Sequence, residues 1–96
     1  MNQERNEKIL IVDDITKNIQ LVANILKREG YKVYFATNGE MAIENSKSIN
    51  FDLILLDIMM PGKDGFEVCK ELKLHETTRE IPIIFLTAKN DQENIK

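Results

Sequence analysis

Short runs of consecutive apolar residues alternate along the chain with segments in which apolar residues recur every three or four positions. The first pattern is typical of strands buried on both faces, and the second of helices with one apolar face. Strands are predicted at residues 8–12, 31–36, 53–56 and 83–86. Helices are predicted at 16–29, over about ten residues after Asn38-Gly39, from 64 to about 75, and from about 90. This alternation predicts one parallel sheet with helices on both faces, and the mixed composition of 31–36 places that strand near an edge.

Single residues predict where the helices begin and end and which sides face the core. Thr16 is expected to cap the first helix and Gly30 to end it, while Asp64 and Glu67 have the spacing of a capping box. The residues expected to face the core are Ile15, Ile19, Val22 and Leu26 in the first helix, Met41, Ala42 and Ile43 in the second, and Phe66, Cys69 and Leu72 in the third. Each helix is therefore predicted to pack on the sheet through one apolar stripe.

Length, charge and cysteine content narrow the class of protein. The 96 residues suffice for one domain, with residues 1–7 as a flexible polar leader and 8–96 as the folded part. The 13 basic and 16 acidic side chains give a net charge of −3, which provides no basic patch for nucleic acid. No apolar run is long enough for a membrane span, and the polar N-terminus carries no secretory signal. The single cysteine, Cys69, excludes an internal disulfide and fits a cytoplasmic location.

Side chains with oxygen ligands directly follow three of the predicted strands. Asp13 and Asp14 follow the first strand, Asp57 the third and Thr87 the fourth. Because the carboxyl ends of parallel strands share one edge of the sheet, these groups are expected to converge there. Crowded carboxylates repel one another unless a cation neutralises them, and hard oxygen ligands suit Mg²⁺. One carboxylate is then a candidate nucleophile toward a phosphoryl group, with Thr87 bonding to a phosphoryl oxygen.

Each of these features alone has a plainer explanation. Asp13 and Asp14 fit a solvated strand end or a helix cap, Asp57 fits the chemistry of the turn that follows it, and Thr87 fits an ordinary cap. Their appearance at three strand ends of one chain favours a shared site instead. An isolated ionised carboxylate is costly to bury, so Asp57 is expected at the rim of the sheet, in water or beside a cation.

Three motifs between residues 8 and 88 carry a resemblance to a known family. They are Ile-Leu-Ile-Val-Asp13-Asp14, Leu-Ile-Leu-Leu-Asp57-Ile-Met-Met-Pro-Gly-Lys-Asp-Gly65, and Ile-Pro-Ile-Ile-Phe-Leu-Thr87-Ala88. With these motifs the chain resembles the receiver (CheY-like) domain of two-component response regulators. Asn18 also resembles a position in receivers of hybrid kinases and of diguanylate-cyclase regulators.

The resemblance implies an α/β fold with a flavodoxin-like doubly wound parallel sheet, in which the strands present here have the order 2-1-3-4. It implies that Asp57 is the phosphoacceptor and Thr87 the switch hydroxyl. Mg²⁺ is expected to bind Asp14 and Asp57 directly, Asp13 mostly through water, and the backbone carbonyl of Met59. The implied phosphodonor is a phosphohistidine on a sensor histidine kinase or a histidine phosphotransfer protein.

One part of the family pattern is missing from these 96 residues. The family has a fifth strand, which ends on a lysine that pairs with the phosphoryl group, and a fifth helix. The chain is therefore expected to be a receiver domain that is incomplete at its C-terminus, either a fragment or a naturally short form. Without a fifth strand, the strand at 83–87 is an apolar edge that invites pairing with a second copy, which predicts a homodimer.

Two other functions compete with phosphotransfer. A truncated receiver without the lysine is also compatible with a module that binds or oligomerises and accepts no phosphate. A Mg²⁺-dependent phosphatase that passes through an aspartyl phosphate is the second rival, but it usually needs an acid two residues after the nucleophile. That position is Met59, which cannot transfer protons. The favoured function is a phosphorylation-controlled signalling module whose output is a binding event, and not an enzyme.

Overall fold

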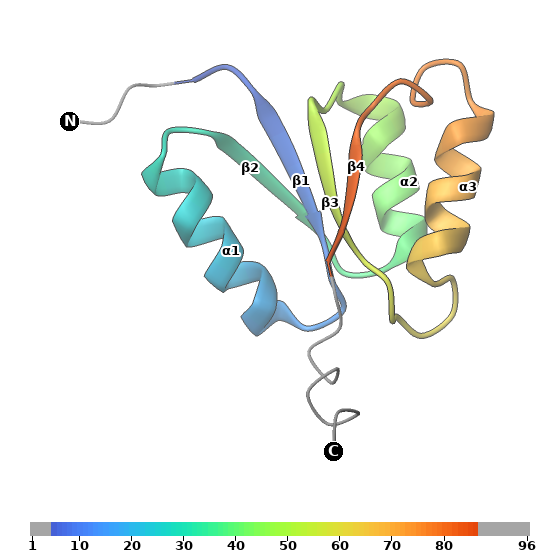
Figure 1. Ribbon diagram of the computed structural model, residues 1–96, viewed down its shortest axis with the longest axis horizontal. Helices are drawn as coiled ribbons and strands as arrows, with labels where there is room; N and C mark the ends of the chain where they lie inside the picture. Colours follow the sequence, from blue (N-terminus) through green and yellow to red (C-terminus); the bar gives the residue numbers. More distant parts are fainter. Residues whose placement is uncertain (1–4, 87–96) are drawn as a thin grey trace.

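The computed structural model describes residues 5–86, and its elements follow the predicted alternation of strands and helices (Figure 1). The strands are β1 (Lys8–Val12), β2 (Lys32–Ala36), β3 (Leu53–Asp57) and β4 (Ile83–Leu86), and the helices are α1 (Thr16–Arg28), α2 (Gly39–Ser48) and α3 (Gly65–Leu74). Within these residues the strands pair in parallel in the order β2-β1-β3-β4. The predicted order is confirmed, with β2 at an edge. The helix predicted from about residue 90 lies outside the described residues.

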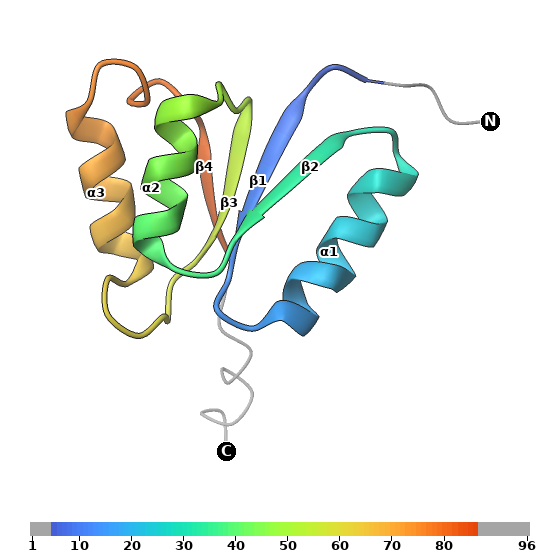
Figure 2. The same cartoon turned by 180° about the vertical axis from the view of Figure 1, so that it is seen from behind.

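The two faces of the sheet are covered unequally. Helix α1 lies on one face, whereas α2 and α3 lie side by side on the other (Figures 1 and 2). Since successive strand residues point to opposite faces, Leu10 and Val12 join the larger core cluster with α2 and α3, while Ile11 joins the smaller cluster with α1. Strand β3 was predicted to be covered on both faces, but Leu55 on the α1 face is only half-buried.

The predicted helix ends are confirmed at most positions. Asn38 caps the start of α2, where its Oδ1 accepts a hydrogen bond from the Met41 backbone N–H at 2.8 Å. Gly30 follows α1 with φ 94°, a left-handed conformation that glycine adopts without strain. The prediction of Thr16 as a cap is wrong. Thr16 is the first residue of α1, and Ile15 holds the cap position without a side-chain hydrogen bond.

Three of the residues expected to face the core are exposed instead. The exposed fractions are 44% for Ile15, 36% for Met41 and 57% for Phe66. In α3 the buried line runs through Val68 and Leu72, one helical turn apart, and Phe66 lies roughly 200° around the helix from Val68. Phe66 therefore packs at the margin of the core, where its ring centroid lies 5.1 Å from that of Phe85. In α3 the buried arc is therefore narrower than the apolar stripe expected from the sequence.

Strand β4 pairs with β3 on one side, and within the described residues nothing pairs with its other side. Ile84 is 52% exposed and the remaining residues of the strand are half-buried. This geometry is compatible with the predicted pairing of a second copy along β4, which stays a prediction. Among the described helices, none combines the length and the apolar character needed to cross a membrane.

Candidate metal centre

Three carboxylates meet at the edge of the sheet where β1 and β3 end. Asp13 and Asp14 follow β1, and Asp57 is the last residue of β3. Each offers one carboxylate oxygen, and these oxygens lie within 4.8 Å of one another. Asp13 and Asp57 are buried, with 4% and 3% of their surface exposed, whereas Asp14 is exposed. Asp57 was expected at the rim of the sheet, in water or beside a cation. Its burial argues against open water, and its place beside a cation stays a prediction.

The sheet itself positions the two buried carboxylates. Val12 at the end of β1 is the register partner of Leu56, so the next residues of both strands, Asp13 and Asp57, emerge side by side. The Asp13 backbone N–H donates to the Ala36 carbonyl at 3.1 Å, which extends the β1–β2 ladder by one residue. The backbones of these two residues are thus fixed by strand pairing on either side of β1.

The Asp13 carboxylate is held by two donors from the start of α1. Its Oδ1 accepts from the Ile15 backbone N–H at 2.9 Å, and its Oδ2 accepts from the Asn18 side-chain amide at 3.3 Å. Sequence reasoning placed Asp13 at the site but gave Asn18 no role there. The sequence did contain a signal for this contact, namely an amide side chain five residues after the carboxylate, in the first turn of the following helix. The sequence alone does not show in which direction that side chain points.

The loop after Asp57 is anchored at both ends. Met60 is buried in the larger core cluster, whereas its neighbour Met59 is 58% exposed. At the other end, the Gly65 backbone N–H donates to the Ile58 carbonyl at 2.9 Å. A Cβ atom on Gly65 would lie 2.8 Å from the Ile58 Cα, so only glycine lets α3 start this close to β3. The predicted roles of the Met59 carbonyl and of Thr87 stay predictions, and Thr87 lies outside the described residues.

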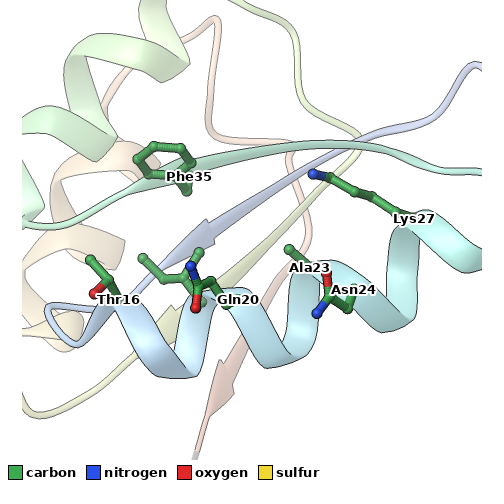
Figure 3. A pocket seen from close by; sticks show the side chains of 7 residues that line it. Thr16, Gln20, Ala23, Asn24, Lys27 and Phe35 are labelled. Carbon is green, nitrogen blue, oxygen red and sulfur yellow. The ribbon is translucent and has the colours of Figure 1, made fainter.

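A hollow of about 580 Å³ lies between α1 and β2 (Figure 3). It is lined by Thr16, Ile19, Gln20, Ala23, Asn24, Lys27 and Phe35. None of the candidate carboxylates takes part in this lining, and the only ionisable group in it is Lys27. With no carboxylate, histidine or cysteine in its lining, the hollow offers no metal ligand set of its own.

The donor set suits a small hard cation. All three side chains in the cluster are carboxylates, and among the described residues no histidine or cysteine joins them. Carboxylate oxygens are the ligands of Mg²⁺, Ca²⁺ and Mn²⁺, whereas softer ions prefer thiolate or imidazole. Three carboxylates at this separation repel one another, and a divalent cation would remove that repulsion. An exposed member such as Asp14 leaves access for water, which Mg²⁺ keeps in its coordination shell.

Comparison with known proteins assigns this arrangement to a family. The family model of the response regulator receiver domain matches residues 9–96. This chain belongs to the receiver domain family of response regulators. Among sequence relatives, it is 46% identical over 94 residues to the transcriptional regulatory protein ResD of Bacillus subtilis. The match covers 98% of this chain and 38% of ResD, so this receiver domain spans well under half the length of that relative.

Two solved structures show receiver domains with magnesium. Response regulator TrrA of Thermotoga maritima, in complex with Mg²⁺-BeF, is 39% identical and has a TM-score of 0.80, covering 92% of this chain and 75% of that one. The receiver domain of sensor histidine kinase PA1611 of Pseudomonas aeruginosa, with magnesium in its active-site cleft, is 31% identical with a TM-score of 0.83. That match covers 95% of this chain and 75% of the other. The receiver fold predicted from the motifs is confirmed.

Proposed function

We propose that this receiver domain accepts a phosphoryl group on Asp57 and thereby shifts an equilibrium between two conformations that bind different partners. The observation that carries the proposal is the convergence of three carboxylate oxygens within 4.8 Å, with Asp57 at the end of a central strand. Membership of the receiver family supports it. The output is a binding event, so the domain is a signalling module and not an enzyme that turns over a small molecule.

The residues that would hold Mg²⁺ are Asp13, Asp14, Asp57 and the backbone carbonyl of Met59. The support is the all-carboxylate donor set and the magnesium found in the related TrrA and PA1611 structures. When bound, Mg²⁺ neutralises negative charge on the carboxylates and on the incoming phosphoryl group. The exposed Asp14 lies on the side open to water, whereas the buried Asp13 and Asp57 are fixed by the sheet.

Asp57 would act as the nucleophile. A carboxylate oxygen of Asp57 forms a bond to phosphorus while the P–N bond of a phosphohistidine breaks. The imidazole nitrogen keeps the electron pair of that bond, takes up a proton and leaves as histidine, and an aspartyl phosphate remains on the receiver. The donor is a sensor histidine kinase or a histidine phosphotransfer protein in the cytoplasm. Thr87 is proposed as the switch hydroxyl that bonds to a phosphoryl oxygen.

Intact mass after incubation with acetyl phosphate and Mg²⁺ tests the proposal directly. We expect the mass of the wild-type chain to rise by one phosphoryl group, and we expect no rise without Mg²⁺ or with excess chelator. The Asp57→Asn variant is the matched control, because it removes the nucleophile while changing the side-chain volume very little. It is expected to stay unmodified under the same conditions.

Two results would overturn this function. One is a wild-type chain that is folded by circular dichroism, binds Mg²⁺ and gains no mass. The other is an Asp57→Asn variant that gains as much mass as the wild type, because the acceptor would then be another residue. A mass gain in the wild type alone would also weigh against the rival binding module that accepts no phosphate.

A further inference from the structure

We infer that Asn18 is a positioning residue for the metal centre: its side-chain amide holds the Asp13 carboxylate in the orientation that a cation requires. The inference rests on the proposed function, since it assigns a partner to one of the proposed metal ligands. It starts from a single contact, the hydrogen bond from Asn18 Nδ2 to Asp13 Oδ2 at 3.3 Å.

The two donors on Asp13 fix the plane of its carboxylate. A carboxylate held by one hydrogen bond can still turn about its Cβ–Cγ bond, but one held at both oxygens cannot. The Ile15 N–H occupies one lone pair of Oδ1 and the Asn18 amide one lone pair of Oδ2. Each oxygen has a second lone pair, so both remain able to accept from a metal-bound water or to bind a cation. Asn18 therefore restricts the rotation of Asp13 without using up its capacity as a ligand.

Charge explains why a neutral donor suits this position. Asp13 is 4% exposed and lies beside two other carboxylates, so negative charge is concentrated at this end of the sheet. The Asn18 amide donates to Asp13 Oδ2 without adding a charge of its own. A lysine or arginine in the same place would also donate, but its positive charge would compete with the cation. An amide thus prepares the site for a metal and does not replace it.

A purely local role in starting α1 fits the contacts less well. The Asn18 backbone N–H already donates to the Ile15 carbonyl at 3.0 Å, so the first turn closes without the side chain. Asn18 is half-buried, although it lies in the first turn of a helix whose neighbouring residues Thr16 and Lys17 are exposed. Its side chain is directed back across the start of the helix to Asp13, and not outward to solvent.

Calorimetric titration with MgCl₂ tests the inference by binding alone. The variant is Asn18→Leu, which keeps a similar volume and removes the donor. We expect its affinity for Mg²⁺ to fall about tenfold, at the low end of the loss caused by removing a residue that orients a metal ligand. Asn24→Leu is the matched control, because Asn24 lies on the same helix beside the hollow between α1 and β2 (Figure 3) and away from the carboxylates. Its Mg²⁺ affinity is expected to equal that of the wild type.

A second measurement reads the orientation of Asp13 without metal. In Asn18→Leu the Ile15 amide, which donates to Asp13 Oδ1, is expected to shift in a ¹H–¹⁵N spectrum and to exchange its hydrogen faster. The same amide is expected to stay unchanged in Asn24→Leu. If Asn18→Leu does not fold, Asn18→Ala serves in both measurements, because alanine is the best helix former.

The outcomes separate this inference from the proposed function. Wild-type protein that fails to bind Mg²⁺ would overturn both. Wild-type binding together with an equal affinity in Asn18→Leu would overturn the positioning role alone. A variant that loses thermal stability but keeps its Mg²⁺ affinity and its Ile15 amide signal would likewise show that Asn18 only supports the helix.

Discussion

Helices α1 and α3 both begin at the edge of the sheet that carries the carboxylates, yet their first turns are built differently. Helix α3 starts with a complete capping box, in which Asp64 accepts from the Glu67 backbone and Glu67 accepts from the Asp64 backbone, both at 2.9 Å. Helix α1 starts after Ile15, whose side chain is 44% exposed and makes no capping hydrogen bond. The Ile15 N–H is taken instead by Asp13, two residues earlier.

The difference separates a helix start that serves stability from one that serves the site. In α3 the acid that caps the helix, Asp64, has no place in the carboxylate cluster. In α1 the nearest acids, Asp13 and Asp14, belong to that cluster and stand before the helix, and its first turn contains no acid. The residues that could have capped α1 are therefore the proposed ligands of the metal, and α1 is left with an apolar residue at its cap position.

The largest expected effect is at the first residue of α3. Gly65→Ala would place a Cβ 2.8 Å from the Ile58 Cα and against the Asp57 carbonyl, so the backbone must shift. We expect a loss of about 1–3 kcal/mol in the free energy of unfolding, as for other overpacked sites. We also expect weaker Mg²⁺ binding, because the shift reaches Asp57. Urea unfolding and calorimetric titration measure the two effects.

A second glycine is the control for this change. Gly30→Ala forces a side chain onto a residue with φ 94°, at the far end of α1 from the carboxylates, and is expected to cost roughly 1–2 kcal/mol. Its Mg²⁺ affinity is expected to match the wild type. Equal loss of Mg²⁺ affinity in both variants would mean that general destabilisation, and not the contact of Gly65 with β3, perturbs the site.

The next effect in size is the loss of the α3 cap. Asp64→Ala removes the acceptor for the Glu67 N–H, and we expect it to destabilise the domain by about 1 kcal/mol. Because Asp64 lies outside the carboxylate cluster, phosphorylation by acetyl phosphate is expected to proceed at the wild-type rate in the folded variant. Glu76→Ala, at an exposed position after α3, is the control and is expected to change neither quantity. A slower reaction of Asp64→Ala would show that the α3 cap also serves the site.

The reverse change at α1 is expected to give a smaller gain. Ile15→Ser supplies the missing cap, since a serine oxygen at this position can accept from an N–H of the first turn. We expect it to stabilise the domain by about 0.5–1 kcal/mol relative to Ile15→Ala, which has no hydroxyl. Thermal unfolding of the two variants measures the difference. Equal unfolding temperatures would mean that the serine hydroxyl makes no capping hydrogen bond, because the hydrogen bond from the residue 15 N–H to Asp13 fixes the backbone in an unsuitable position.

Much of the fold could be predicted from the sequence because each element is indicated by several residues together. The apolar runs at β1, β3 and β4 fix the strands, and in a parallel sheet the ends of these strands must share an edge. The meeting of Asp13, Asp14 and Asp57 follows from that topology alone and required no knowledge of side-chain directions. The capping box of α3 was equally visible, since its two residues lie three positions apart on the chain.

The features that were missed depend on side-chain directions that no short pattern encodes. Met59 and Met60 are adjacent and identical in type, yet one is 58% exposed and the other 7%. The contact of Asn18 with Asp13 joins side chains five residues apart across the start of α1, and Ile15 between them is exposed at the cap position of that helix. The burial of Asp57 beside other acids also runs against the ordinary cost of burying charge.

The smallest expected effect lies in the loop that leads to the start of α3. Lys63 Nζ lies 3.1 Å from Glu71 Oε1, and the hydrogen bond and charge of Glu71 raise the pKa of Lys63 above 10.5. Because the pKa is raised in the folded state, the pair contributes to stability below pH 10.5 and loses that contribution as the pH rises through the higher folded value. Both side chains are accessible to water, so salt and solvent weaken the pair.

We therefore expect Glu71→Gln to leave the urea midpoint at pH 7 within the scatter of the measurement. Any difference from the wild type is expected to vanish as the pH rises through the raised pKa of Lys63. Glu44→Gln is the control, because Glu44 is an exposed carboxylate of α2 without an ion pair among the described residues. A clear loss of stability in Glu71→Gln that persists above the folded pKa would contradict this assignment, since the glutamate would then act through packing and not through its charge. Either result refines the comparison of the two helix starts. A negligible effect would mean that the capping box alone stabilises the start of α3. A clear effect would mean that the ion pair of Lys63 with Glu71 stabilises it as well.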